Sequence, residues 1–389
     1  MIRSAGSRTT NRSGGAGLSD EIGVATTASA PSAPRRGMRS LLSDMLFGTR
    51  FVTIWLAIGL LLIVCRIVAP SALSSTSLSA VLPFGSVIAV VALGQMLVIM
   101  MGGIDLSMAA SISLLANVMV GAANDQNGRI AYGVVVVMVC AIAIGLVNGL
   151  LIAVLELNPL IVTLSTSLVL RGITTQYRVG IANNSGVPKA LSRVVFEKVL
   201  GISYTAWFAF VLMLVVGLLL RSTAAGRRFQ AVGANRRAAW MAGFHVRLHV
   251  VVAYIGASIA AGIAGIILGG LLASPGVSVG ANYLFGPVSA VVLGGAALSG
   301  GLASPASTWA AAIFVKLLLQ LLAVRGLSVG SQPIVYGAVI VLGMLISGDR
   351  IADVIGRLLV RSSLQDSAND SARASPAPPI STHQTQVAE

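Results

Sequence analysis

The sequence predicts an all-α polytopic membrane protein. Hydrophobic residues make up 56% of the 389 residues, and charged residues make up only 10%. Several apolar runs reach the roughly 20 residues that an α-helix needs to cross about 30 Å of hydrocarbon. The formal net charge is +14, and the basic residues lie mostly in the N-terminal tail, the loop of residues 221–248 and the C-terminal tail, which is the distribution that orientation in a membrane produces. The basic charge therefore does not indicate a nucleic-acid partner.

About ten transmembrane helices are expected, some of them broken near the middle of the membrane. Their predicted ranges are 51–69, 80–101, 104–122, 131–156, 158–176, 204–220, 249–272, 284–302, 305–323 and 332–346. Ten crossings place both termini on one side of the membrane, and the arginine-rich loop lies on that same side. Because lysine and arginine accumulate in cytoplasmic loops, we expect cytoplasmic N- and C-termini.

The chain divides into one membrane domain and two tails. Residues 1–48 are rich in Ser, Gly, Ala, Thr and Arg, and residues 349–389 are polar and rich in Pro. Neither segment has enough apolar residues to offset the entropy lost on ordering, so both are predicted to be largely disordered cytoplasmic tails. Residues 49–348 form the predicted transmembrane domain. Cys65 and Cys140 lie within apolar runs and indicate neither a disulfide nor a metal site.

The loop of residues 221–248 is predicted to dock on a partner. It holds no acidic residue and six arginines: Arg221, Arg227, Arg228, Arg236, Arg237 and Arg247. Its centre predicts a short helix, with Asn235 as the N-cap and Gly243 closing the C-terminus in a left-handed conformation. A capped cytoplasmic helix is typical of helix-in-groove recognition. The alternative is a basic loop that rests on anionic lipid.

The longest predicted outer segment, residues 177–203, is expected to be partly helical and able to receive a periplasmic partner. Lys316 and Gln320 are spaced to share one helix face within a predicted span. A cation at that depth is expected to face the bundle or a wet cavity.

Two segments are predicted to interrupt the membrane helices. In the first, Gly102 and Gly103 precede Asp105 and Ser107, and either polar residue can cap a new helix. In the second, two glycine pairs precede Pro305. Irregular backbone in the membrane must be covered by protein or line a cavity, so both segments are also candidates for a substrate path. The candidate path residues are Gly102, Gly103, Asp105, Ser107, Asn158, Gly294 and Gly295.

The sequence lacks the motifs of several enzyme classes. It contains no phosphate-binding G-x-x-x-x-G-K-[ST] loop, no H-E-x-x-H metal motif and no G-x-S-x-G nucleophile turn. We therefore expect neither catalysis nor a cofactor in this chain. Asp105 is the only acidic residue well inside a predicted span, so the carboxylate chains of many proton-coupled carriers are also missing. The energy for any transport is expected to come from another subunit.

Together these features resemble the permease subunits of bacterial ribose/xylose/arabinose-type ABC sugar importers. The resemblance covers residues 50–350 and rests on Gly102-Gly103-Ile104-Asp105-Leu106-Ser107, Asn158 to Leu164, Arg171-Gly172, the loop residues, and Gly294-Gly295 with Gly300-Gly301. Ala109, Ala303 and Ser307 stand where that family commonly has glycine.

The resemblance implies a subunit of the bacterial inner membrane that moves a monosaccharide or related polyol. Its implied partners are an ABC ATPase subunit that binds ATP and Mg²⁺, a periplasmic sugar-binding protein and a second permease copy. The implied ATPase-coupling residues are Gly233, Asn235, Arg236, Arg237, Ala238, Ala239 and Gly243. A permease for branched-chain amino acids and an ion-coupled secondary carrier are the alternative functions.

Overall fold

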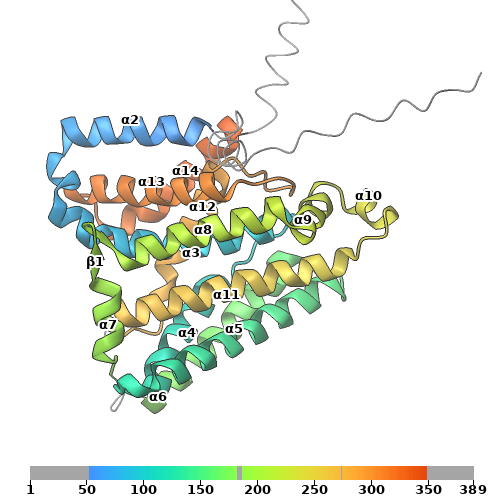
Figure 1. Cartoon of the computed structure of the whole chain (residues 1–389), viewed down its shortest axis with the longest axis horizontal. Coiled ribbons are helices and arrows are strands. Elements are labelled where there is room, and N and C mark those ends of the chain that lie inside the picture. The colour runs from blue at the N-terminus through green and yellow to red at the C-terminus, as the bar shows by residue number, and fades with distance from the viewer. Residues whose placement is uncertain (1–51, 182–185, 273, 348–389) are drawn as a thin grey trace, which may run out of the picture. The chain divides into compact units, whose positions relative to one another are not determined.

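The computed structural model describes residues 52–181, 186–272 and 274–347 (Figure 1). The described part of the chain is an all-α membrane protein with one two-stranded hairpin, β1 (Lys198–Val199) and β2 (Ile202–Ser203). The predicted tails, residues 1–48 and 349–389, lie outside the described residues. The longer helices are α2 (Val52–Val68), α3 (Ser75–Met100), α4 (Met108–Ala123), α5 (Ile130–Ala153), α6 (Pro159–Ile181), α8 (Tyr204–Ser222), α11 (Val246–Leu272), α13 (Pro305–Val324) and α14 (Gln332–Ser347).

Four shorter α-helices complete the described chain: α7 (Lys189–Phe196), α9 (Ala224–Ala234), α10 (Arg236–Met241) and α12 (Phe285–Leu293). The 3-10 turns are η2 (Pro70–Leu73), η3 (Asn127–Arg129), η4 (Val279–Tyr283) and η5 (Val329–Ser331). Within the described ranges, five helical segments are long and apolar enough to cross a membrane, and four further apolar segments are shorter. Each of the ten predicted ranges overlaps one of these α-helices.

Two predicted ranges include a stretch that is not helical, one at its start and the other at its end, and glycines with positive φ lie beside or within these stretches. The range 104–122 becomes helical only at Met108, and the range 284–302 is helical only to Leu293. Gly102 has a φ of +68°, and Gly295, Gly300 and Gly301 have φ values between +91° and +113°. These left-handed conformations cannot continue a right-handed helix. We call residues 101–107 the first break and residues 294–304 the second break.

The sequence interpretation also missed α9 and the hairpin. Helix α9 begins at Ala224 and is capped by Thr223, whose hydroxyl accepts a hydrogen bond from the Gly226 amide at 2.9 Å. The hairpin turns at Leu200 and Gly201, which both have positive φ. The expectation that residues 177–203 are partly helical is confirmed, because α6 extends to Ile181 and α7 follows.

The helices run between two ends of the bundle, which we name by the short helix at each. At the α10 end, the last turn of α3 meets α9, and Arg247 of α11 forms a 3.0 Å ion pair with Glu156 after α5. At the α7 end, Val195 of α7 packs against Gly270 of α11. Figure 1 shows α9 and α10 at one end of α8 and α11, with β1 and α7 at the other.

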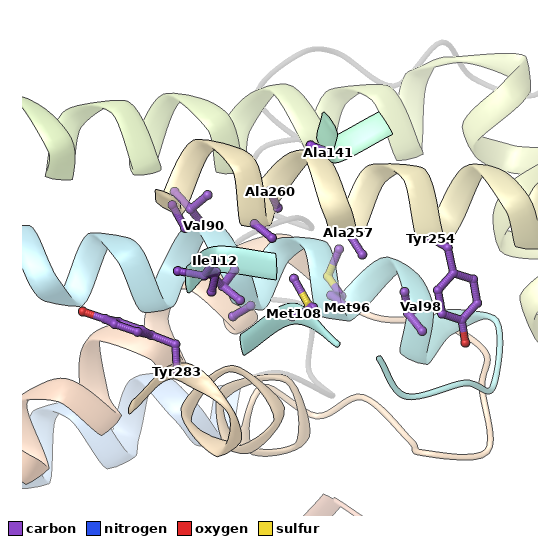
Figure 2. Packing of buried hydrophobic residues seen from close by; sticks show 14 of the residues in the cluster. Val90, Met96, Val98, Met108, Ile112, Ala141, Tyr254, Ala257, Ala260 and Tyr283 are labelled. Atoms are coloured by element: carbon purple, nitrogen blue, oxygen red, sulfur yellow. The ribbon is translucent and has the colours of Figure 1, made fainter. Parts of the chain in front are cut away.

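Helix α11 is the centre of the bundle and packs against α3, α4 and α5. Its neighbours approach through glycines: a Cβ at Gly145 would lie 2.6 Å from the Ile255 Cα, and one at Gly149 would lie 2.8 Å from the Val251 Cα. Figure 2 shows Ala257 and Ala260 of α11 in the same packed region as Met96 of α3 and Ile112 of α4. Close backbone contact replaces the hydrophobic drive that lipid cannot supply.

We expect Gly145→Val to destabilise the protein because its side chain would overlap the backbone of α11. Overpacking of this kind costs about 1–3 kcal/mol. Thermal unfolding of the detergent-solubilised protein measures the loss. The matched control is Gly172→Val, since Gly172 lies within α6 with nothing within 4 Å of its position for a Cβ. Equal melting temperatures for the two variants would contradict the close approach of α5 and α11.

Candidate functional site

The short helix predicted in the arginine-rich loop is confirmed as α10. The Asn235 side-chain oxygen accepts a hydrogen bond from the Ala238 amide at 2.9 Å, which caps the N-terminus. Gly243 has a φ of +80°, and its amide donates to the Trp240 carbonyl at 2.9 Å. Both ends of a helix of only six residues are therefore closed by its own loop.

Helix α10 packs through one face and exposes another. Ala239 is buried, whereas Trp240 is 71% exposed and Met241 is 69% exposed. Arg237 is also exposed. A large aromatic side chain and a flexible thioether beside a cation form the kind of surface that is enriched at protein interfaces. The exposed face of α10 therefore has the chemistry of a docking surface.

Asp105 and Ser107 lie in the first break, at the start of α4. Asp105 is only 3% exposed, and its Oδ1 accepts hydrogen bonds from the Ser107 amide at 2.8 Å and the Ser107 hydroxyl at 2.6 Å. Ser107 occupies the N-cap position, but its side chain forms no capping bond. Asp105 thus satisfies donors at the start of α4 that would otherwise lack a partner.

A chain of hydrogen bonds extends from this cap to two other helices. Asn148 of α5 donates to the Ser107 hydroxyl at 2.9 Å, and Thr166 of α6 donates to the Asn148 side-chain oxygen at 2.7 Å. We call Asp105, Ser107, Asn148 and Thr166 the polar chain. Because a polar network in a low-dielectric interior is costly when any member lacks its partner, the polar chain fixes the start of α4 relative to α5 and α6.

The backbone of Asp105 is held as well. The Gln95 amide, oriented to satisfy its hydrogen bonds, donates to the Asp105 carbonyl at 3.2 Å and accepts from the Asp105 amide at 3.1 Å. The second carboxylate oxygen of Asp105 and the hydroxyl of Tyr254 are buried without a hydrogen-bond partner among the described residues. Tyr254 points from α11 toward Val98 near the end of α3 (Figure 2).

The two breaks, which are about 200 residues apart in sequence, contact each other. The Gly301 amide donates to the Met100 carbonyl at 3.1 Å. A Cβ at Gly102 would lie 3.2 Å from the Ser299 carbonyl oxygen, and one at Gly300 would lie 3.1 Å from the Met100 carbonyl oxygen. Both positions also have positive φ. Glycine is therefore required twice over where the breaks meet.

The remaining candidate path residues lie close to the breaks or at the bundle end. Gly103 lies against Tyr254, where a Cβ would be 2.5 Å from the hydroxyl oxygen, and Gly294 packs on the backbone of Thr308. Asn158 caps α6 by accepting a hydrogen bond from the Leu160 amide at 2.9 Å. It lines a cavity of about 1500 Å³ at the α10 end, together with Arg236, Arg237 and Trp240.

A second cavity of about 440 Å³ lies between α4, α6 and the segment around η4. Its polar lining residues are Ser113, Ser167, Arg171 and Ser278, beside the ring of Phe285. A largely apolar cavity with a few polar groups is typical of small-molecule sites. Among the candidate path residues, only Asn158 lines either of these two cavities.

Comparison with known proteins identifies the family. Residues 77–347 match the family described as branched-chain amino acid transport system / permease component. The chain belongs to this family. The permease is 31% identical over 311 residues to the ribose import permease protein of Bacillus subtilis, which covers 77% of this chain and 92% of the relative. No solved structure matches the chain.

Two further relatives of the permease are also named for sugars. The L-arabinose ABC transporter permease protein of Azospirillum brasilense is 29% identical over 328 residues, covering 82% of this chain and 91% of the relative. The galactose/methyl galactoside import permease protein of Escherichia coli is 29% identical over 300 residues, covering 73% of this chain and 89% of the relative. The resemblance to sugar importer permeases is confirmed.

Of the polar residues that line the smaller cavity of the permease, only Arg171 was named in the sequence, as part of the family resemblance and not as a candidate path residue. Ser167 and Arg171 are four residues apart and share one face of α6, which is the signal that could have identified them. Ser113 and Ser278 belong to segments far apart in sequence, and nothing in either segment indicates that they meet.

We expect Asp105→Ala to destabilise the permease more than Asp105→Asn. Alanine removes the acceptor of two buried hydrogen bonds, and each buried donor left without a partner costs about 1–3 kcal/mol. Asparagine keeps an oxygen that can accept from Ser107. Thermal unfolding in detergent ranks the two variants. An equal loss in both would mean that the negative charge of Asp105 is needed rather than its acceptor.

Proposed function

We propose that the chain is the membrane-spanning subunit of an ABC importer that moves a monosaccharide, either a pentose, a hexose or a related polyol. The observation that carries this proposal is the group of relatives named for ribose, arabinose and galactose import, each of which matches over about nine tenths of its own length. Transport proceeds by alternating access, with no covalent chemistry in this subunit.

Import of a branched-chain amino acid is the nearest alternative, because the family description names that substrate. The three relatives reported above are named for sugars, and this favours a sugar. An ion-coupled carrier is less consistent with the structure, since Asp105 is occupied by the cap of α4.

The proposed topology has ten crossings and both termini in the cytoplasm of a bacterial cell, with the permease in the inner membrane. Successive helices run alternately toward the α10 end and the α7 end of the bundle. The α10 end carries Arg227, Arg228, Arg236 and Arg237. Because arginine accumulates on the cytoplasmic side, the α10 end faces the cytoplasm and the α7 end faces the periplasm.

The proposed partners follow from this orientation. An ABC ATPase subunit, which holds ATP and Mg²⁺, binds the exposed face of α10 as a helix-in-groove contact. A periplasmic sugar-binding protein delivers substrate at the α7 end. A second permease copy completes the membrane unit, and the exposed apolar side chains of α6, such as Leu164 and Leu168, are available to it or to lipid.

The direct test is uptake by proteoliposomes that contain the permease with its ATPase and binding protein. We expect uptake of labelled ribose, arabinose or galactose to require ATP on the side of the membrane that holds the ATPase. This uptake should exceed uptake of labelled leucine. Leucine uptake above that of every sugar would select the amino-acid alternative. Uptake that persists without ATP and collapses with an ionophore would select the ion-coupled carrier.

We expect Trp240→Ala to weaken binding of the ATPase subunit by about tenfold or more, because buried interface tryptophans commonly contribute at least about 2 kcal/mol. Titration of the purified ATPase into solubilised permease measures the affinity. The matched control is Tyr132→Ala, which removes an exposed aromatic ring at the opposite end of the bundle. Unchanged affinity for the ATPase, with weaker binding to anionic liposomes, would favour lipid contact for α10.

A further inference from the structure

We call α9 and α10 together the helical hairpin, to distinguish it from the β1–β2 hairpin. The helical hairpin contacts the first break through two residues. The Arg236 guanidinium donates a hydrogen bond to the Met101 carbonyl. Gly233, at the end of α9, lies so close to the end of α3 that a Cβ there would be 2.6 Å from the Met100 carbonyl oxygen and 3.4 Å from the Gly301 carbonyl oxygen. The helical hairpin therefore contacts both breaks where they meet.

These contacts occupy carbonyl groups that a helix cannot satisfy by itself. The last carbonyls of an α-helix have no intrahelical partner. The Met100 carbonyl accepts from Gly301 of the second break, and the Met101 carbonyl accepts from Arg236 of α10. A cation is also favourable at the C-terminal end of a helix dipole. The end of α3 is thus closed by two segments that lie far away in the sequence.

The rest of the first break, beyond Met101, is also restrained by hydrogen bonds. The Gly103 amide donates to the Val98 carbonyl at 3.1 Å, and Gln95 holds both backbone groups of Asp105. Four residues beyond Met101, Asp105 begins the polar chain to α5 and α6. Hydrogen bonds therefore connect the segment that follows Met101 to Asn148 and Thr166.

The neighbouring arginines of α10 differ in their contacts. Arg236 bonds to the first break, whereas Arg237 forms no hydrogen bond or ion pair with the part of the chain that the structure describes. The two side chains have the same charge and adjacent positions. Both are exposed, so they are a matched pair that differs in the hydrogen bond from Arg236 to the Met101 carbonyl.

We propose that Gly233 and Arg236 are positioning residues that transmit movement of α10 directly to the first break and the polar chain. This inference rests on the proposed function, in which an ATPase moves α10. The alternative is that movement of α10 is transmitted only through α8 and α11, the long helices before and after the helical hairpin. A direct link requires close packing at Gly233 and a donor at position 236, and the longer route requires neither.

The test compares Arg236→Ala, Arg236→Lys, Gly233→Ala and Arg237→Ala in the full importer. Three quantities are measured: affinity for the ATPase, ATP hydrolysis, and labelled sugar moved per ATP hydrolysed. We expect Arg236→Ala and Gly233→Ala to bind the ATPase normally but to move about fivefold less sugar per ATP, within the usual range of coupling energies. Arg236→Lys keeps a cationic donor and is expected to recover most of the loss. Arg237→Ala, which changes the docking face of α10, is expected to lower the affinity for the ATPase without lowering the amount of sugar moved per ATP hydrolysed by the assembled complex.

Hydrogen exchange of the permease alone provides a second measurement that needs neither sugar nor ATPase. We expect amides of residues 101–107 to exchange faster in Arg236→Ala than in Arg237→Ala, because only the first loses the bond to Met101. Equal exchange and an unchanged sugar-to-ATP ratio in Arg236→Ala would overturn the inference. Loss of ATPase affinity equal to the loss of uptake would also overturn it, since Arg236 would then be a docking residue. A wild-type complex that moves no sugar would instead overturn the proposed function.

Discussion

The structure depends on closing the end of α3 with groups from elsewhere in the chain. Buried backbone that leaves a helix must find hydrogen-bond partners in the protein, because an unpaired buried carbonyl is costly. Here the Met100 and Met101 carbonyls are satisfied by Gly301 and Arg236. Without these contacts two carbonyls at buried residues would lack hydrogen-bond partners. The second break and the helical hairpin of α9 and α10 are therefore parts of one site, although the sequence separates them from α3 by more than a hundred residues.

The same constraint explains why the site is rich in glycine. Gly102 and Gly300 combine positive φ with close backbone contact, and each requirement alone disfavours a side chain. Gly233 has an ordinary helical backbone, but the Met100 carbonyl occupies the place of its Cβ. Glycine at Gly233 is thus a packing requirement, whereas glycine at Gly102 and Gly300 is also a conformational one. A substitution at either kind of position would separate the surfaces that satisfy the end of α3.

The sequence predicted the local features of this site well, and the structure adds what those features contact. Asn235 and Gly243 predicted the ends of α10 because capping depends on neighbouring residues. The breaks were found because glycine pairs interrupt apolar runs. The early end of α12 was missed, since hydrophobicity continues past Leu293. Helix α9 was missed because its arginines were interpreted only as loop charge. The bond between Arg236 and Met101 could not be predicted, because both members of an adjacent arginine pair are equally plausible partners for any distant carbonyl.

Polar and apolar side chains are distributed differently around the breaks and on the exposed face of α10. Around the breaks, buried polar groups are joined by hydrogen bonds, and such groups resist independent displacement because an unmade bond in the interior is costly. The exposed face of α10 carries Trp240 and Met241, and burying these apolar side chains against a partner would lower the free energy. A force applied to that face therefore reaches a segment that cannot absorb it locally. It must be passed on to α5 and α6 through the polar chain, and α6 is the helix that lines the smaller cavity with Ser167 and Arg171.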